Sequence, residues 1–313
     1  MPADAGLTPS ILITGARGQV GFELCRSLAP LGRVVAVDRS RCDLARPEQV
    51  RQLVREVRPD VIVNAAAYTA VDRAEDDATL AFAVNRDGPA LLAEEAARAG
   101  ILLVHYSTDY VFDGAKDSPY VEEDRPAPLS VYGHSKLAGE QAVLGSAASA
   151  LVLRTSWVAG SHGGNFARTM LALARQRDTL RVVADQIGAP TMAALLADVT
   201  AQIVARHWLH GDRAAFAGGL YHVTAAGETS WHGYACEVLR LAAQRGVALQ
   251  AMPEAVEPIP TSAYPRPARR PANSRLDTAK LRRTFGIHLP DWRSGVAQLL
   301  DQILDGEPAC AKA

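Results

Sequence analysis

Three glycines placed directly after a short apolar run constrain the fold more than any other feature of this chain. The run at residues 10–14 is the size of a strand and ends at Gly15-Ala-Arg-Gly18-Gln-Val-Gly21, after which apolar residues recur at helical spacing. Glycines in a strand–turn–helix unit let the backbone turn tightly and approach a pyrophosphate at the positive end of the helix. The pattern therefore predicts a dinucleotide site at Gly15, Gly18 and Gly21, in preference to a glycine turn that binds nothing.

Strand-sized apolar runs alternate with helical stretches through the first half of the chain. Strands are expected at residues 10–14, 33–37, 61–63, 101–104 and 151–153, and helices from residue 47 and over residues 87–99 and 132–144. The strand runs are continuously apolar, as expected when helices cover both faces of a sheet. This order predicts an α/β fold, a Rossmann-type doubly wound parallel sheet, with the dinucleotide-binding domain and the catalytic residues within residues 1–160.

The second half of the chain has a different texture. Helices are expected over residues 165–175, 193–208, 231–244 and 293–304, with a strand at residues 220–223. Six prolines between residues 253 and 271 exclude regular helix and central strand there, which leaves a linker or an ordered loop over a site. We expect residues 161–313 to form mainly a smaller C-terminal α/β substrate-binding lobe, with some segments returning to the Rossmann core.

Charge balance and apolar patterning exclude several classes of protein. The 313 residues hold 33 Lys and Arg against 34 Asp and Glu, so there is no excess of positive charge to neutralise nucleic-acid phosphates. No apolar run approaches the roughly 18 residues of a membrane span, and residues 1–10 lack the pattern of a signal peptide. Four scattered cysteines without a Cys-x-x-Cys pair argue against a zinc site. A cytoplasmic protein without nucleic-acid or membrane partners is expected.

The end of the second predicted strand indicates a nicotinamide cofactor and leaves its identity open. Asp38 lies 23 positions after Gly15, where a carboxylate can bind the adenosine ribose 2′-hydroxyl of NAD. Arg39 follows at once and Arg17 lies in the glycine turn, and either guanidinium can hold the 2′-phosphate of NADP. Each arginine is equally well explained as a solvated surface charge. The expected cofactor is NADPH or NADH, with use of both.

A tyrosine and a lysine one helical turn apart indicate an acid–base site. In Tyr132-Gly-His-Ser-Lys136 the two side chains share one helix face, and the ammonium together with a cationic nicotinamide is expected to lower the pKa of the phenol. Such a pair alone is usually structural. Here it follows a dinucleotide site and also Thr108, which ends a predicted strand where active sites of such sheets lie. We predict Thr108, Tyr132 and Lys136 as catalytic residues.

These elements, in this order, resemble the extended short-chain dehydrogenases/reductases, and the finer motifs resemble one family among them, the dTDP-4-dehydrorhamnose reductases. The matching stretches run from about residue 10 to residue 300 and are specific only as a set. They are residues 64–72 (NAAAYTAVD), 105–114 (HYSTDYVFDG), 131–140 (VYGHSKLAGE), 153–157 (LRTSW), 165–166 (NF), 185–191 (DQIGAPT) and 268–276 (ARRPANSRL).

The resemblance implies roles at the matching positions. Tyr132 is the expected proton donor, Lys136 tunes it and anchors a ribose, and Thr108 binds a 4-keto oxygen. The expected cofactor-binding residues are Gly15, Arg17, Gly18, Gln19, Val20 and Gly21 at the pyrophosphate, Asp38, Arg39, Asp43 and Leu44 at the adenosine, and Ala66, Ala67, Tyr68, Thr69, Tyr106, Tyr132 and Lys136 on the remaining side of the cofactor.

The resemblance also implies a site for the substrate. Its expected residues are Thr108, Asp109, Tyr110, Tyr132 and Trp157. Judged by residue type alone, Trp157 is a core residue more often than a ligand. Arg269 and Arg270 in the proline-rich segment either pair with a substrate pyrophosphate or form a solvated basic pair.

One departure from the family pattern concerns assembly. Some members resemble metal-bridged dimers, with carboxylates near the helix after the Gly-Ala-Pro-Thr sequence and in the last helix. Two of those positions are Ala194 and Gln302 here, and neutral side chains remove the charge that Mg²⁺ prefers. We expect no metal ligands, no Mg²⁺ at a dimer interface, and a monomer or a weak homodimer.

The implied reaction is the NAD(P)H-dependent reduction of the 4-keto group of dTDP-4-dehydro-β-L-rhamnose to dTDP-L-rhamnose, a precursor of cell-surface polysaccharide. The partner is then a small nucleotide sugar. A sugar-nucleotide dehydratase would carry Asp-Glu after the threonine, where this chain has Asp109-Tyr110. An epimerase that holds its nicotinamide tightly stays an alternative. So does a non-catalytic subunit resembling the regulatory subunit of some methionine adenosyltransferases.

Overall fold

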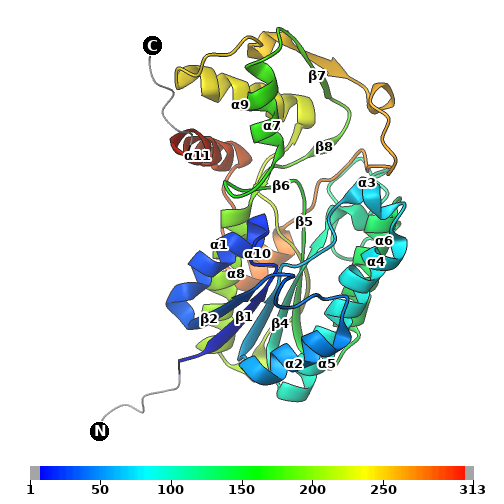
Figure 1. The fold of residues 1–313 in the computed structure, drawn as a ribbon, viewed down its shortest axis with the longest axis vertical. Helices are drawn as coiled ribbons and strands as arrows, with labels where there is room; N and C mark the ends of the chain where they lie inside the picture. The colour runs from blue at the N-terminus through cyan, green and yellow to red at the C-terminus, as the bar shows by residue number, and fades with distance from the viewer. Residues whose placement is uncertain (1–7, 307–313) are drawn as a thin grey trace.

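A six-stranded parallel sheet forms the centre of the protein, whose computed structural model describes residues 8–306 (Figure 1). The strand order is β10-β5-β4-β3-β1-β2, so successive strands are added first on one side of β1 and then on the other. The predicted Rossmann-type α/β fold is confirmed. The strands are β1 (Ser10–Thr14), β2 (Arg33–Val37), β3 (Val61–Asn64), β4 (Leu102–Thr108), β5 (Ser149–Thr155) and β10 (Gly219–His222).

Helices cover both faces of this sheet, which explains why its strands read as unbroken apolar runs. Ile11 and Ile13 of β1 pack on one face and Leu12 on the other, and all three are fully buried. Burial of a side chain of this size contributes about 1.5–3 kcal/mol. The first face is covered by α1 (Gln19–Leu28), α8 (Ala193–Ile203) and α10 (Ala279–Phe285), and the second by α2 (Pro47–Val57), α5 (Gly88–Ala99) and α6 (Val131–Leu144).

A second, smaller core lies beyond the end of the sheet, in the upper part of Figure 1. Its fully buried aromatic side chains include Tyr234 and Trp292. Pro258 sits in one of its strands, which is tolerated because a two-stranded sheet consists of edges. The proline-rich segment is therefore partly a strand. The lobe is built from α7 (Phe166–Ala174), α9 (Trp231–Gln244), α11 (Trp292–Asp305) and the parallel pair β7 (Leu180–Val183) and β12 (Val256–Ile259).

Short elements connect these layers and shape the end of the sheet. The short helical elements of the described residues are η1 (Ala29–Leu31), α3 (Val71–Ala74), α4 (Ala78–Phe82), the π-helix η2 (Ala83–Asp87), η3 (Asp109–Val111), the π-helix η4 (Val204–Leu209), η5 (Arg213–Ala215), η6 (Pro253–Ala255) and η7 (Thr261–Ala263). The helix expected over residues 87–99 is α5, and two short helical segments, α4 and η2, lead directly into it. The short strands pair as β6 (Val158–Ala159) with β9 (Thr191–Met192) and β8 (Ile187–Gly188) with β11 (Thr229–Ser230).

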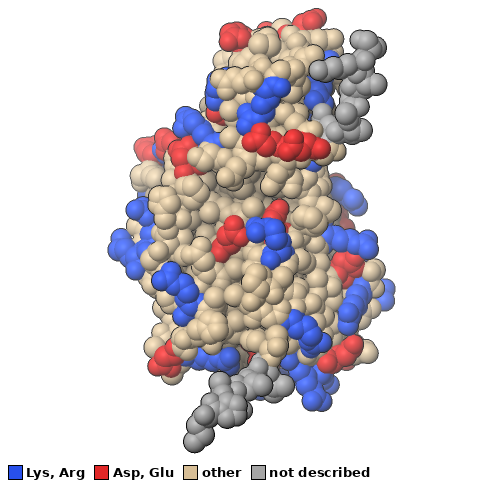
Figure 2. Space-filling model, turned by 90° about the vertical axis from the view of Figure 1, so that its left-hand side faces the viewer, with Lys and Arg blue, Asp and Glu red and all other residues tan. Residues whose placement is uncertain are grey.

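The surface carries charges of both signs. On the face seen in Figure 2, Lys and Arg side chains are interspersed with Asp and Glu, and neither sign forms a dominant patch. This agrees with the net charge of −1 and gives that face no footprint for a nucleic-acid backbone. Within residues 8–306, no helix has both the length and the apolar character needed to span a bilayer.

Candidate active site

The turn after β1 is so tight that two of its positions require glycine. Gly15 has a φ of 73°, and a Cβ there would lie 2.6 Å from the backbone nitrogen of Ala66. A Cβ on Gly21 would lie 2.1 Å from the carbonyl oxygen of Gly15, so α1 packs directly on the turn. No side chain caps α1 at Gly18, so the N–H groups of its first turn suit a pyrophosphate.

Gln19 joins this turn to the second half of the chain. Its Oε1 accepts a hydrogen bond from the backbone nitrogen of Gly160 at 2.6 Å. Beside it, the ring of Phe22 stacks on that of His162 with centroids 4.5 Å apart. The neighbouring Val20 packs against the core of the first sheet face. The predicted pyrophosphate residues therefore form one wall with the loop that follows β6.

At the end of β2, each of the two predicted carboxylates holds one of the predicted arginines. Arg17 Nε lies 2.5 Å from Asp38 Oδ2, and Arg39 Nε lies 3.2 Å from Asp43 Oδ2. Hydrogen bonds from Ser40 hold the pKa of Asp38 below its usual value, so this carboxylate stays ionised. Both arginine side chains are mostly exposed and free to turn toward a ligand. The structure thus places the carboxylates that favour NAD beside the arginines that favour NADP, and it leaves the choice between the two cofactors open.

A buried network fixes the chain where it leaves β3. Asn64 Oδ1 accepts a hydrogen bond from Thr14 Oγ1 at 2.6 Å, and its Nδ2 lies 3.0 Å from His105 Nδ1. Burial holds the pKa of His105 well below its usual value, so the imidazole is neutral. Asn64 Oδ1 also accepts from the backbone nitrogen of Ala66 at 3.2 Å, which orients the predicted ribose-side residues 66–69 toward the glycine turn.

Asn85 is a site residue that the sequence pattern missed. Its Oδ1 accepts from the backbone nitrogen of Tyr68 at 2.8 Å, and its Nδ2 donates to the Tyr68 carbonyl at 3.1 Å and to Ser135 Oγ at 3.0 Å. It lies on the π-helix η2, a local widening that is frequent at functional sites. No sequence pattern marks this asparagine, and its complete burial is known only from the structure. Asn85 ties the predicted cofactor loop to the helix of Tyr132.

The three predicted catalytic residues meet at the carboxyl end of β4. Ser130 caps α6 by accepting from the backbone nitrogen of Gly133 at 3.2 Å, and the first turns of this helix carry Tyr132 and Lys136. Thr108 ends β4, close enough to Tyr132 for its hydroxyl to hydrogen-bond the phenol. Lys136 Nζ donates to the carbonyl oxygen of Tyr106 at 2.6 Å.

Burial opposes the lowering of the phenol pKa that we expect from the ammonium together with a cationic nicotinamide. Burial raises the pKa of Tyr132 to about 12, and the Thr108 hydroxyl offsets this only in part. Burial also lowers the pKa of Lys136 to about 8, with nearby Glu140 acting in the opposite direction. The ammonium bonds to a carbonyl and is no source of the phenol shift. At neutral pH the phenol is therefore protonated and able to donate.

Tyr106, a predicted cofactor residue, contributes its backbone to the site. Its side chain is buried under the sheet, where its hydroxyl lies 2.5 Å from Thr200 Oγ1 of α8.

One turn after Lys136, Glu140 forms a buried ion pair with Arg154 of β5, with contacts of 2.7 and 2.9 Å. This bidentate pair fastens the catalytic helix to the sheet.

A cavity of about 660 Å³ lies between the end of the sheet and the smaller lobe. Tyr110 lines it, and the Tyr110 ring stands edge-on to Tyr132 with centroids 5.5 Å apart, so one side chain separates the cavity from the predicted proton donor. Its lining includes an aromatic side chain from each of α7 and α9, Phe166 and Trp231. Five arginines also line it: Arg177, Arg181, Arg266, Arg269 and Arg270. Such a lining suits an anionic ligand with a planar or sugar-like part.

Arg270 is not a freely solvated charge, which was one of the two interpretations of the sequence. Its guanidinium forms a bidentate pair with Asp72 of α3, with distances of 3.0 and 2.9 Å. The same carboxylate accepts from the backbone nitrogen of Ala268 at 3.2 Å, and these bonds lower the pKa of Asp72. Asp72 therefore fastens the proline-rich segment to the cofactor-binding half of the chain.

The remaining predicted substrate residues lie near the cavity in different settings. Trp157 has a φ of 47° and stacks on Trp231 at 3.8 Å between ring centroids, while staying half-buried. A left-handed backbone is costly for a tryptophan and typical of functional positions. Asp109 is buried, and Thr108 Oγ1 donates to its Oδ1 at 3.1 Å. Within residues 8–306, no three His, Cys, Asp or Glu side chains gather as a metal site.

Comparison with known proteins gives the family. The model of the RmlD substrate binding domain family matches residues 9–304. The chain belongs to this family. It is 52% identical to the dTDP-4-dehydrorhamnose reductase of Burkholderia thailandensis over 297 residues, which cover 94% of this chain and 99% of that protein.

Solved structures of other family members have the same fold. The dTDP-4-dehydrorhamnose reductase of Clostridium acetobutylicum superposes with a TM-score of 0.86 at 35% identity, over 94% of this chain and 99% of that one. The enzyme of Bacillus anthracis, solved in complex with NADP, superposes with a TM-score of 0.85 at 34% identity, over 95% of this chain and 100% of that one. The family resemblance seen in the motifs is confirmed over nearly the whole chain.

Proposed function

We propose that this member of the RmlD family reduces the 4-keto group of dTDP-4-dehydro-β-L-rhamnose to dTDP-L-rhamnose with NAD(P)H. The observation that carries the proposal is the position of Tyr132. Its phenol is protonated, lies beside Thr108 at the end of β4, and stands next to Tyr110, which lines the cavity that also holds five arginines. The names of the relatives support the nucleotide sugar as substrate.

The chemistry divides between cofactor and protein. NAD(P)H, when bound, supplies a hydride to C4 of the sugar. Tyr132 donates its proton to the oxygen that becomes negative, and the Thr108 hydroxyl stabilises that oxygen by a hydrogen bond. The residues fit the cofactor: Gly15 and Gly21 leave the space that a Cβ would fill, and the uncapped start of α1 offers N–H groups to a pyrophosphate.

The arginine-lined cavity supplies the substrate's diphosphate site in this proposal. A guanidinium matches phosphate oxygens in a bidentate geometry, so several of them hold a nucleoside diphosphate firmly. Asp109, Tyr110 and Trp157 are proposed on the sugar side, as the family resemblance implies.

The decisive experiment measures loss of reduced-nicotinamide absorbance with dTDP-4-dehydrorhamnose, in parallel with NADH and NADPH. Turnover that forms dTDP-L-rhamnose, identified by mass and chromatography, is the expected result. A folded protein that turns over neither cofactor would sink the proposal. Cofactor found bound in stoichiometric amount after purification would favour the epimerase alternative.

Removal of either adenosine-side arginine should change cofactor preference. We expect Arg17→Ala or Arg39→Ala to raise the KM for NADPH by about 10–100-fold and to leave that for NADH nearly unchanged, because one charge-assisted bond to the 2′-phosphate is worth about 1.5–3 kcal/mol. Arg41→Ala is the control, since Arg41 is also exposed and pairs with Glu56 at 3.3 Å. Equal losses for both cofactors would contradict the assignment.

The lowered pKa of Lys136 predicts an alkaline limit to activity. The ammonium is present below pH 8 and is lost as pH rises through the pKa of about 8. Since kcat/KM for the cofactor reports the free enzyme, it should fall above that pH as the ribose anchor loses its charge. The measurement is kcat/KM for NADPH across a pH series. A flat profile through this range would show that Lys136 keeps its proton or is dispensable.

The assembly is proposed as a monomer or weak homodimer in the cytoplasm, without Mg²⁺ at an interface. Support comes from the neutral side chains of Ala194 on α8 and Gln302 on α11. Sedimentation velocity with and without a chelator should give the same species. A dimer that dissociates on chelation would refute this part of the proposal.

A further inference from the structure

Buried polar atoms without partners gather where β4 and β5 end. Among the described residues, Asp109 Oδ2, Ser107 Oγ, Thr155 Oγ1 and Ser156 Oγ are shielded from solvent and have no hydrogen-bond partner. They are neighbours because β4 and β5 run parallel with Thr108 opposite Thr155. A buried polar atom without a partner is costly, and an internal water molecule can satisfy it. The ends of these strands therefore carry unused hydrogen-bonding capacity next to Thr108.

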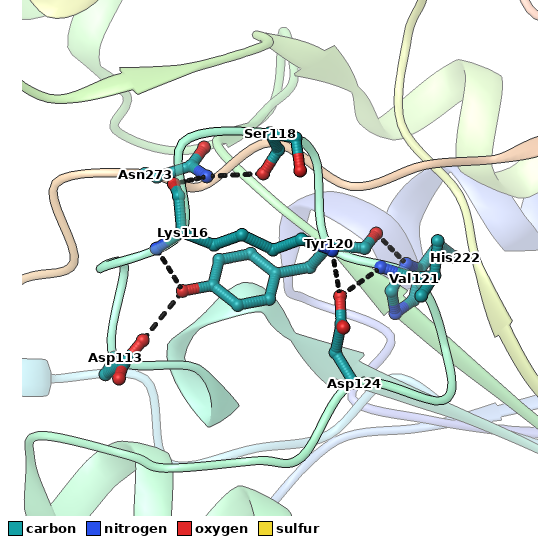
Figure 3. Close-up of polar contacts among 8 residues, drawn as sticks. All are labelled: Asp113, Lys116, Ser118, Tyr120, Val121, Asp124, His222 and Asn273. Atoms are coloured by element: carbon teal, nitrogen blue, oxygen red, sulfur yellow. Dashed lines mark hydrogen bonds and ion pairs between the residues drawn. The ribbon is translucent and has the colours of Figure 1, made fainter.

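The segment around Ser274 closes this region from the other side. Figure 3 shows the Asn273 amide directed at the loop after β4, where its Nδ2 donates to the carbonyls of Lys116 at 2.7 Å and Ser118 at 2.9 Å. The backbone nitrogen of Ser274 donates to the Ile187 carbonyl at 2.7 Å. Held on both sides, Ser274 lies close enough to the Asp109 carboxyl to oppose the rise in its pKa that burial causes.

The loop that receives Asn273 is itself ordered by a compact set of contacts, also seen in Figure 3. Tyr120 donates its phenol proton to Asp113 Oδ1 at 2.7 Å, and its ring stacks on Phe112 with centroids 4.1 Å apart. Lys116 Nζ lies 2.6 Å from Asp124 Oδ2. These contacts give the Asn273 anchor fixed acceptors, so the position of Ser274 does not depend on a bound ligand.

A second cavity opens behind this point. It has a volume of about 320 Å³ and is lined by Ser156, Ser274, Thr224 and Thr278, with charged Glu228 and Arg282 at its wall. It shares no lining residue with the larger cavity, which Tyr110 lines. Asp109 thus lies in the interior between Thr108, which faces the reaction, and Ser274, which faces this second cavity.

We propose that the second cavity returns protons to the active site along the path Ser274, Asp109, Thr108 and Tyr132. The inference rests on the proposed function, in which each turnover leaves Tyr132 as a phenolate. The Thr108 hydroxyl gives its proton to the phenolate and takes one from the protonated Asp109 carboxyl. Asp109 then regains a proton from solvent in the second cavity, passed by the Ser274 hydroxyl. No bond other than O–H changes, and each turnover takes one proton from solvent.

The Asp109 carboxyl is suited to both states that such a path requires. Burial raises its pKa to about 6, while Ser274 and Thr108 act in the opposite direction. The other titratable groups that interact with it are the phenols of Tyr110 and Tyr132, both protonated at neutral pH. Near neutral pH the carboxyl therefore exchanges its proton without a large energetic cost in either direction.

The test separates the first turnover from those that follow. Tyr132 starts protonated, so the first hydride transfer needs no resupply. In Ser274→Ala we expect a first-turnover rate constant close to that of the wild type in stopped flow, and a steady-state kcat lower by about tenfold or more. In Asp109→Asn, the dependence of kcat on a group with a pKa near 6 should also disappear. Thr278→Val is the control, since it removes a hydroxyl from the same cavity away from Asp109.

Each result has one meaning. A Ser274→Ala kcat within about twofold of the wild type would overturn the path, and so would an equal fall of its first-turnover and steady-state rates, because Ser274 would then act on the chemical step or on folding. An Asp109→Asn protein that fails to fold leaves Ser274→Ala to decide. A wild type without turnover defeats the proposed function itself, before the variants are compared.

Discussion

Replacement of Tyr132 by phenylalanine is expected to lower kcat by about 10²–10⁴-fold, the usual contribution of a positioned general acid. The substitution keeps the ring, and with it the edge-on contact to Tyr110. It removes only the hydroxyl, whose pKa of about 12 makes it a donor at neutral pH. The affinity for NADPH should stay close to that of the wild type. The measurement is kcat from absorbance loss, together with cofactor binding by fluorescence.

Tyr234→Phe is the matched control for this loss. Tyr234 is buried in the core of the smaller lobe, and its hydroxyl has no hydrogen-bond partner among the described side chains. The control removes a tyrosine hydroxyl without touching the catalytic group, so its kcat should match the wild type. A Tyr132→Phe enzyme with near-normal turnover would show that another group protonates the product.

Replacement of Glu140 by glutamine is expected to lower the free energy of unfolding by about 3–5 kcal/mol, because it leaves the Arg154 guanidinium charged and buried without its counter-ion. Both side chains are almost completely inaccessible, with exposed fractions of 1% for Glu140 and 3% for Arg154. The pair joins α6 to β5, so its loss also loosens the helix that carries Lys136. Urea unfolding followed by circular dichroism measures the change.

The double variant Glu140→Leu with Arg154→Met tests the cause. Replacing both members of a buried pair by apolar residues is often neutral or stabilising, so most of the lost stability should return. If the double variant is as unstable as Glu140→Gln, the hydrogen-bond geometry or the contact of Arg154 with the Phe112 ring outweighs the charge. Wild-type stability in the single variant would contradict the argument outright.

Strand positions and fold class were predictable because helices cover both faces of the sheet. Ile11, Leu12 and Ile13 read as one apolar run for that reason, and the glycine turn marks the edge of the sheet where the site forms. The catalytic residues were predictable as a set because their order along the chain matches the order of strand ends. Periodicity and motif spacing are local patterns of a few residues, and such patterns were enough to predict the strands, the fold class and the order of the site residues.

The parts that could not be predicted depend on contacts between distant residues. Asp72 and Arg270 are 198 positions apart, and no local pattern pairs them. The pKa of Tyr132 depends on how deeply the finished fold buries the phenol, which overrides the effect of a lysine one turn away. Asn85 owes its position to a π-turn that helical periodicity does not reveal.

The tether at Asp72 bears on how two ligands share one protein. Asp72 lies only six residues after Ala66, whose backbone closes against the glycine turn. Residues 66–72 thus border the predicted dinucleotide site at one end. At the other end, Asp72 binds Arg270 and the backbone of Ala268, which line the larger cavity. The same backbone stretch belongs to the walls of both sites, with Ala66 at the glycine turn and Asp72 at the arginine-lined cavity. Any displacement of this stretch at one site would displace the wall of the other, which is the structural requirement for coupled binding of two ligands.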